Sequence, residues 1–321
     1  MKQLLRMLVT VIALSAAAFF LVSVSPVDPL SANVGQVAMG SMSPEQIEKL
    51  KTYWGVGQPP LERFLCWAGD FVRGDMGISL LYRRPVAEVM AERLFASLGI
   101  MSAAWVISGL LGLALGIAAG ARKGSAVDRF VTSYSLVTAS TPAFWLAILL
   151  LLVFSVWLGW LPAGLSVPIG MESSLVTAGD RLRHAILPAV TLSITGVSNI
   201  ALHTREKMVD VLESDYILFA RARGESMGSI VWRHGLRGIS LPAITLQFGS
   251  VSEIIGGSVL VEQVFSYPGL GQAAVTAGLG SDLPLLMGIT LITSAIVFGG
   301  NLAADLLYGA VDPKIRRRAA K

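Results

Sequence analysis

Few ionisable residues lie within the long apolar stretches of this 321-residue sequence, and Glu253 is the one best placed to act on a solute. It stands near the middle of such a stretch and is followed by Gly256 and Gly257. Charged side chains in apolar stretches usually face the interior of a helix bundle or a water-filled cavity. Two interpretations are open: these three residues line a pathway for a polar solute, or the carboxylate is hydrogen-bonded to a neighbouring helix.

The residues and motifs for other site chemistry are missing. The sequence has no glycine-rich loop that ends in Gly-Lys-Ser or Gly-Lys-Thr, so we expect ATP not to bind to this chain. His-Glu-x-x-His and Gly-x-Ser-x-Gly are absent, and His184, His203 and His234 are not at metal-ligand spacing. We therefore expect no catalytic residue, no metal and no cofactor in this chain. An intramembrane enzyme that pairs Glu253 with another polar group is the alternative from a different class.

The composition indicates a membrane protein. Hydrophobic residues make up 54% of the chain and charged residues 14%, whereas soluble domains have roughly 25% charged residues. The net charge is only +4, and the basic residues gather at the ends of apolar stretches rather than in a stripe with aromatic residues. This pattern favours membrane lipid and argues against nucleic acid as a partner. The single cysteine, Cys66, excludes an intrachain disulfide.

The apolar stretches predict an all-α membrane protein with six transmembrane helices, because a spanning helix needs about 20 mainly apolar residues. They cover approximately residues 4–24, 95–119, 130–161, 185–203, 239–261 and 283–311. The first stretch has a cleavable signal peptide as its alternative, but it exceeds the usual signal core of about 7–15 residues. The third is too long for one straight helix, and we expect Pro142 to kink or divide it. The second carries Gly112, Gly116 and Gly120, a spacing that allows close approach of a neighbouring helix.

This pattern divides the chain into four parts. They are a first transmembrane helix at 1–24, an extramembrane subdomain at 25–94, a five-helix core at 95–311 with a polar segment at 215–238, and a tail at 312–321. Lysine and arginine gather in the short loops at 121–129 and 204–238 and in the tail. The bias of basic residues towards cytoplasmic loops therefore places both termini in the cytoplasm. The 25–94 segment is expected outside, because long loops cross the membrane largely regardless of their charge.

The polar segment 215–238 interrupts apolar sequence and is a candidate docking surface. We expect a helix over 216–223 that stops at Gly224, with the small Ala220 and Ala222 fitting closely into the groove of a partner. The residues assigned to this surface are Asp215, Tyr216, Ala220, Arg221, Ala222, Arg223 and Gly224. A solvated basic loop without a partner is the alternative.

A second loop, near the other membrane face, contains a turn at Pro268 and Gly269 and then Gly271. The semi-apolar residues 273–279 that follow suggest a short re-entrant or external helix that caps a pathway. The alternative is a plain turn between two spans.

Ordered motifs run along nearly the whole chain. They include Gly74-Asp75-Met76-Gly77-Ile78-Ser79, Pro142-Ala143-Phe144-Trp145, Ala220-Arg221-Ala222-Arg223-Gly224, Glu262-x-Val264-Phe265, Pro268-Gly269-Leu270-Gly271 and Asp305-Leu306-Leu307-Tyr308. With them the sequence resembles the inner-membrane permease subunits of binding-protein-dependent ABC importers, in the peptide/nickel group of dipeptide and oligopeptide permeases. General importers have Glu-Ala-Ala where this chain has Leu218-Phe219-Ala220. In this departure the chain is similar to the peptide/nickel group.

The resemblance implies a type I ABC importer permease fold with an extended periplasmic segment after the first helix, in the bacterial inner membrane. It implies that 215–238 is the coupling region, which sits in a groove of a separate ATPase subunit. Two such ATPase subunits would bind ATP and Mg. A second homologous permease would complete a heterodimer, and a periplasmic substrate-binding protein would deliver the solute. The chain would then be a transporter subunit for di- and oligopeptides and not an enzyme, with nickel or a metal chelate as the alternative substrate.

Overall fold

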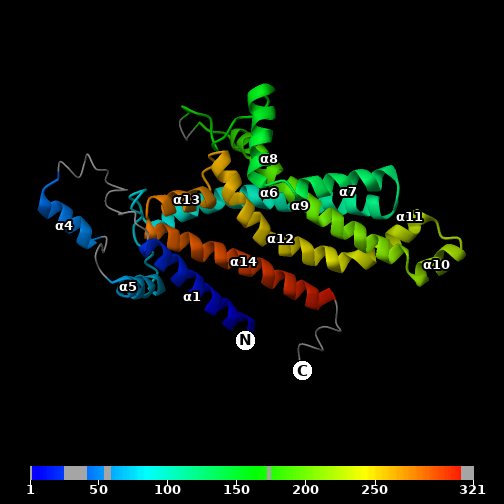
Figure 1. The fold of residues 1–321 in the computed structure, drawn as a ribbon, viewed down its shortest axis with the longest axis horizontal. Coiled ribbons are helices and arrows are strands. Elements are labelled where there is room, and N and C mark those ends of the chain that lie inside the picture. The colour runs from blue at the N-terminus through cyan, green and yellow to red at the C-terminus, as the bar shows by residue number, and fades with distance from the viewer. Residues whose placement is uncertain (1, 25–41, 54–58, 172–174, 312–321) are drawn as a thin grey trace. The chain divides into compact units, whose positions relative to one another are not determined.

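The computed structural model describes residues 2–24, 42–53, 59–171 and 175–311, and the regular elements among these residues are helices (Figure 1). An isolated backbone bridge joins Ile78 to Pro85. The helices are α1 (Lys2–Ser23), α4 (Pro44–Tyr53), α5 (Pro60–Val72), α6 (Val86–Gly120), α7 (Ala126–Ala139), α8 (Ala143–Leu150), the π-helical η1 (Leu151–Trp157), α9 (Ala178–Leu212), α10 (Asp215–Ala222), α11 (Met227–Ile230), the π-helical η2 (Val231–Gly235), α12 (Leu236–Val264), α13 (Leu270–Leu279) and α14 (Leu283–Val311). The all-α prediction is confirmed for this part of the chain.

Within the described residues, four helices are long and apolar enough to cross a membrane. They are Val86–Gly120, Ala178–Leu212, Met227–Val264 and Leu283–Leu307. The pair Ala126–Ala139 and Ala143–Trp157 adds a fifth if it is taken as one span bent by 104°. The apolar part of α1, Val9–Ser23, is shorter than a full span. The count of six therefore stays a prediction.

Pro142 divides the third apolar stretch, as expected, and the local chemistry explains why the helix ends there. The side-chain hydroxyls of Thr138, Ser140 and Thr141 donate to carbonyl oxygens one turn earlier in α7, at 2.8, 2.9 and 2.8 Å. Pro142 has no N–H to continue the helix and instead caps the start of α8 with an extended backbone. These hydroxyl bonds give the last carbonyls of α7 donors other than water where the helix ends.

The chain forms two compact units. Unit 1 comprises Met1–Ser97 and Pro268–Ile296, and unit 2 comprises Leu98–Tyr267 and Val297–Lys321. Helix α6 begins at Val86, so nine residues of the expected 25–94 subdomain already belong to this long helix.

The core of unit 1 brings α6, α13 and α14 together. The buried residues are Val86, Val89, Met90, Leu270, Ala273, Ala277, Leu285 and Ile289. Asp282 fixes the loop before α6 to the start of α14: its fully buried carboxylate accepts hydrogen bonds from Ser79 Oγ (2.5 Å), Leu81 N–H (3.0 Å) and Leu285 N–H (3.2 Å). The motif at 74–79 therefore ends in a residue with a structural role.

Unit 2 is built around α9, which packs against α12, α7 and α8. The helix begins with a capping box, in which Thr177 Oγ1 accepts from Asp180 N–H and Asp180 Oδ2 accepts from Thr177 N–H. Its C-terminal half is tied to α7 by Arg205, whose Nε and Nη2 donate to the buried Asp128 carboxylate at 2.7 and 2.8 Å. This paired geometry compensates the cost of burying the Asp128 carboxylate.

The three glycines of α6 lie against α9. A Cβ atom on Gly112 would lie 2.7 Å from Ile200 Cβ, one on Gly116 2.5 Å from Thr204 Cβ, and one on Gly120 2.6 Å from Met208 Cβ. The partner residues recur every four positions along one face of α9, as two helices in close backbone contact require. The glycine spacing in the sequence thus predicted a real helix contact.

Candidate functional site

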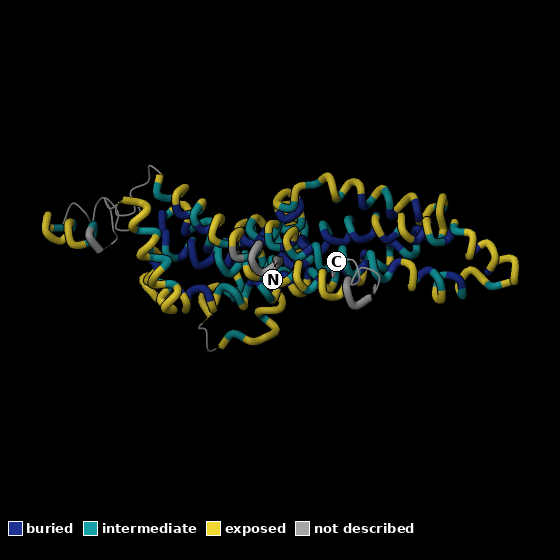
Figure 2. Tube along the Cα trace, turned by 90° about the horizontal axis from the view of Figure 1, so that it is seen from below, coloured by how far each residue is buried: buried dark blue, intermediate teal, exposed yellow. Residues whose placement is uncertain are grey.

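The polar segment 215–238 folds into α10, α11 and η2 and continues into α12 (Figure 1). Ile217, Ala220 and Ile230 of this segment form a small core with residues of α9 and α12, namely Met208, Leu212 and Ile239. Gly224 ends α10 with a φ of +81°, a backbone conformation that favours glycine. The predicted helix and its glycine stop are confirmed, and this end of unit 2 is coloured mainly as exposed in Figure 2.

The opposite side of α10 presents large apolar side chains to the surroundings. Phe219 is 67% exposed and Leu218 59%, and Trp232 on η2 is 75% exposed. Asp215, Tyr216, Arg221, Ala222 and Arg223 are exposed as well. We call the exposed set Tyr216, Leu218, Phe219, Ala222 and Trp232 the α10 face.

The expectation that Ala220 fits into the groove of a partner is wrong, because Ala220 is only 5% exposed and packs inside its own chain. Its small size fits α10 onto the rest of unit 2, not onto a partner. Leu218, Phe219 and Trp232 were not among the residues assigned to the docking surface from the sequence. Helical spacing offered a signal for two of them: Leu218 and Phe219 lie on the side of α10 away from Ile217 and Ala220.

Glu253 on α12 is exposed and lies beside α9. Asn199 Nδ2 donates to its two carboxylate oxygens at 3.4 and 3.3 Å. One turn along α9, His203 is also exposed, and its Nδ1 lies 3.0 Å from the Asn199 carbonyl oxygen. That oxygen can only accept, so His203 carries its proton on Nδ1. The structure confirms that the Glu253 carboxylate is hydrogen-bonded to a neighbouring helix. The carboxylate is also exposed on one side, and its place on a pathway stays a prediction.

The two glycines after Glu253 face different surroundings. A Cβ atom on Gly256 would meet open space, whereas one on Gly257 would touch Leu192 of α9 at 3.4 Å. Gly256 therefore shares the open side with Glu253, and Gly257 belongs to the α9–α12 contact. The contact of Glu253 with Asn199 was not predicted from the sequence. Asn199 and His203 are four residues apart, a spacing that places these two side chains on one face of α9.

The loop at Pro268 leads into the helix α13 and is not a plain turn. Gly269 and Gly271 are buried in unit 1, and the Leu270 N–H donates to Ser97 Oγ at 2.7 Å. These residues contribute to the packing of α13 against the first part of α6.

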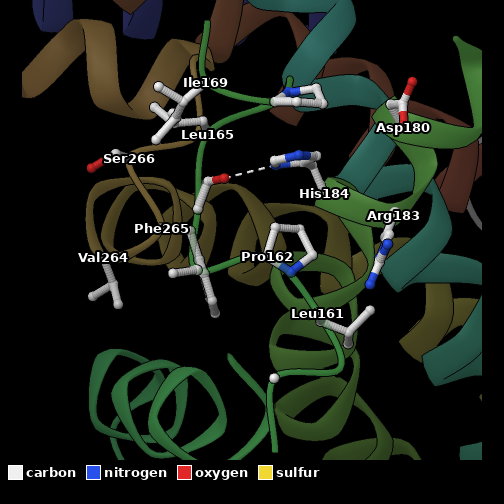
Figure 3. Close-up of a pocket in the computed structure, with 14 residues that line it drawn as sticks. Leu161, Pro162, Leu165, Ile169, Asp180, Arg183, His184, Val264, Phe265 and Ser266 are labelled. Atoms are coloured by element: carbon white, nitrogen blue, oxygen red, sulfur yellow. Dashed lines mark hydrogen bonds between the residues drawn. The ribbon is translucent and has the colours of Figure 1, made fainter. Parts of the chain in front are cut away.

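A cavity of about 620 Å³ lies at the end of α9 farthest from α10 (Figure 3). Its lining is mostly apolar and includes Leu161, Pro162, Leu165 and Ile169, with His184 and Arg183 of α9 on the side opposite Ile169. The Leu165 N–H donates to the Phe265 carbonyl at 2.9 Å, and Leu165 has a φ of +64°. A bulky residue rarely adopts this conformation, so the wall of the cavity holds a strained backbone in place.

Two side chains of α9 also fix this wall. His184 Nδ1 donates to the Gly164 carbonyl at 2.7 Å, and Arg183 Nη2 donates to the Trp160 carbonyl at 2.8 Å. Gly164 has no room for a side chain, since a Cβ atom would lie 2.3 Å from the Phe265 carbonyl oxygen. Beside the cavity, burial and the negative charge of Glu262 raise the pKa of Tyr267, although Arg181 opposes them. The Tyr267 phenol is therefore neutral at physiological pH.

In the part of the chain that the structure describes, no three histidine, cysteine or acidic side chains gather as a metal site would require.

Comparison with known proteins finds similarity along the whole chain. Residues 112–317 match the family described as the binding-protein-dependent transport system inner membrane component. The chain is 33% identical over 315 residues to the oligopeptide transport system permease protein AppB of Bacillus subtilis, with 98% of each chain covered. It is 34% identical over 316 residues to a putative peptide transport system permease protein of Brucella abortus, again with 98% of each covered. It is 35% identical over 318 residues to the glutathione transport system permease protein GsiC of Escherichia coli, which covers 98% of this chain and 97% of the relative.

Proposed function

Because the chain belongs to the family of inner membrane components of binding-protein-dependent transport systems, we propose that it is the membrane-spanning subunit of an ATP-driven importer of di- and oligopeptides. The names of the relatives refer to peptides, oligopeptides or glutathione, which supports peptides over nickel or a metal chelate. A transporter family also argues against the intramembrane enzyme based on Glu253.

The α10 face couples this subunit to an ATPase. Its large apolar side chains are exposed on a short helix whose other side is anchored in a core of its own chain. Apolar and aromatic side chains on a rigid support are typical of the centre of a protein interface. This exposed face is the observation that carries the proposal. Two separate ATPase subunits would bind ATP and Mg, and one of them would act on α10 here.

The pathway for the solute runs along the open side of Glu253, Gly256 and Asn199. A carboxylate such as Glu253 on a membrane-crossing helix is costly unless it serves a polar pathway or a partner. A second, homologous permease would close this side and form a heterodimer around the path. A periplasmic binding protein would deliver the peptide at the end of α9 where the 620 Å³ cavity lies.

The proposed topology has six spans in the bacterial inner membrane, with α1 as the first and both termini in the cytoplasm. Residues 25–94 would form the periplasmic segment, and 312–321 the cytoplasmic tail. These ranges lie in part outside the described residues. The gathering of lysine and arginine at 121–129 and around α10 supports this orientation.

The test is whether the α10 face holds the ATPase. Phe219→Asp and Ala222→Glu should leave membrane insertion intact but abolish co-purification of the ATPase subunits and peptide uptake, because each places a charge where a groove must close. Leu279→Asp is the matched control: Leu279 is 74% exposed on α13, and its variant should retain the ATPases. If both α10-face variants keep full uptake and bound ATPases, α10 is not the coupling element.

A further inference from the structure

We propose that a second cavity, near α10, binds the phosphate-bearing headgroup of an anionic phospholipid. The cavity has a volume of about 430 Å³ and belongs entirely to unit 2. Its lining includes Arg122, Lys123, Glu213, Leu218, Arg221 and Met227. It lies where α6 and α9 end and α10 runs past them. It shares Leu218 with the α10 face, and its other lining residues lie outside that face.

The charges around this cavity favour an anion. Lys123 forms an ion pair with Glu213, so these two charges neutralise each other. The guanidinium groups of Arg122 and Arg221 have no ion-pair partner among the described residues. The cavity therefore has two uncompensated positive charges, one on Arg122 after α6 and one on Arg221 of α10. A guanidinium group matches the oxygen atoms of a phosphate with paired hydrogen bonds.

The position of the cavity favours a lipid over a soluble anion. Helices α6 and α9, which end at the cavity, are both apolar enough to cross a membrane. Basic pockets at the ends of transmembrane helices are suited to acidic lipid headgroups. The apolar Leu218 and Met227 line the same cavity and are 59% and 43% exposed. They offer a surface for the first carbons of an acyl chain beside the charged headgroup.

The volume is adequate for this ligand. Water occupies about 30 Å³ per molecule in the liquid, so the cavity has the volume of roughly fourteen water molecules. A phosphodiester with its glycerol fits within that space. The bound headgroup would contact both Arg122, just past the end of α6, and Arg221 on α10, and thereby hold the coupling helix against the membrane-crossing helices.

The experiment measures lipid retained by the full-length chain. The protein is purified from membranes, exchanged into nanodiscs of phosphatidylcholine with or without phosphatidylglycerol, and bound lipid is counted by native mass spectrometry. The proposal expects phosphatidylglycerol to be retained in preference to phosphatidylcholine. Arg122→Gln with Arg221→Gln should reduce that preference about 25-fold, because each arginine contributes about fivefold to binding of an acidic surface.

The control is Arg129→Gln with Arg237→Gln, which removes the same charge from two exposed arginines outside the cavity. It should retain phosphatidylglycerol like the unchanged protein. Arg221→Lys keeps the charge but loses the planar fork and should show an intermediate preference. Equal melting temperatures of all variants in phosphatidylcholine establish that they are folded.

Three results would overturn the proposal. The first is equal loss of phosphatidylglycerol from the cavity and control variants. The second is binding of inorganic phosphate in detergent with no preference among lipids. The third is unchanged lipid retention in the cavity variant together with lost ATPase co-purification, which would assign the cavity to the partner protein. Because lipid retention needs neither ATPase nor uptake, the result does not depend on the proposed transport function.

Discussion

Glu253 combines a charge, an open side and a position in a membrane-crossing helix. Its hydrogen bonds to Asn199, at 3.3 and 3.4 Å, are long and leave acceptor capacity on both oxygens. A protonated amino group is the cation that every unmodified peptide carries. The carboxylate is therefore suited to meet the amino terminus of a passing peptide.

We predict that Glu253→Gln lowers uptake of peptides with a free amino terminus by at least about tenfold, because a hydrogen bond to a charged group contributes about 1.5–3 kcal/mol. Uptake into proteoliposomes that contain the complete importer measures this. N-acetylated peptides should be affected little.

Glu206→Gln is the matched control, since it removes an exposed carboxylate from α9 without changing the Asn199–Glu253 contact. Equal loss of uptake for free and acetylated peptides would assign Glu253 to packing.

At the scale of helices, the glycines of α6 determine how closely α9 approaches. Gly116 is the tightest of the three, because a Cβ atom would also lie 2.7 Å from the Ala201 carbonyl, which is backbone. A neighbouring backbone cannot rotate away as a flexible side chain can.

Gly116→Ala should therefore destabilise the protein by about 1–3 kcal/mol, the usual cost of overpacking. Thermal unfolding in detergent would show a lower midpoint. Gly99→Ala on the same helix is the control, since nothing lies within 4 Å of its added Cβ atom. Equal midpoints for the two variants would contradict the close contact.

The sequence predicted where helices begin, end and touch better than it predicted which side of a helix is buried. Glycine spacing gave the α6–α9 contact, Pro142 gave the division of the third apolar stretch, and Gly224 gave the end of α10. The role of Ala220 was wrong, because the small size of a side chain does not tell which neighbour it fits. Burial against Ile217 and Ile230 is decided by tertiary packing, which no local pattern contains.

Contacts between residues far apart in the sequence were also not predicted. Nothing in the sequence connects Ser79 with Asp282, Asp128 with Arg205, or Asn199 with Glu253, because each pair lies far apart along the chain. The cavities were missed for the same reason: their walls come from several elements that only the fold brings together.

At the scale of the whole molecule, the orientation in the membrane is open to a direct test. Cys66 is the single cysteine of the sequence, and it is exposed on α5. The proposed topology puts it outside the cytoplasm.

A membrane-impermeant maleimide should therefore label Cys66 in intact spheroplasts. Gly228→Cys in a Cys66→Ser background is the matched control, because Gly228 is exposed on α11 near α10. It should be labelled only after the membrane is permeabilised. Labelling of Gly228→Cys in intact cells, with Cys66 protected, would reverse the orientation.

The short link between α9 and α10 has a mechanical consequence. Only Glu213 and Ser214 separate the two helices, and Ile217 and Ala220 join α10 to the same core as Met208 and Leu212 of α9. Past Pro188, α9 continues for 24 residues from Ala189 to Leu212, a rod of about 36 Å at 1.5 Å per residue. A displacement of α10 is therefore transmitted to α9, because the two-residue link between them is too short and too well packed to act as a flexible hinge. It must tilt this rod, and Asn199, near its middle, would be displaced by about half as much as its end.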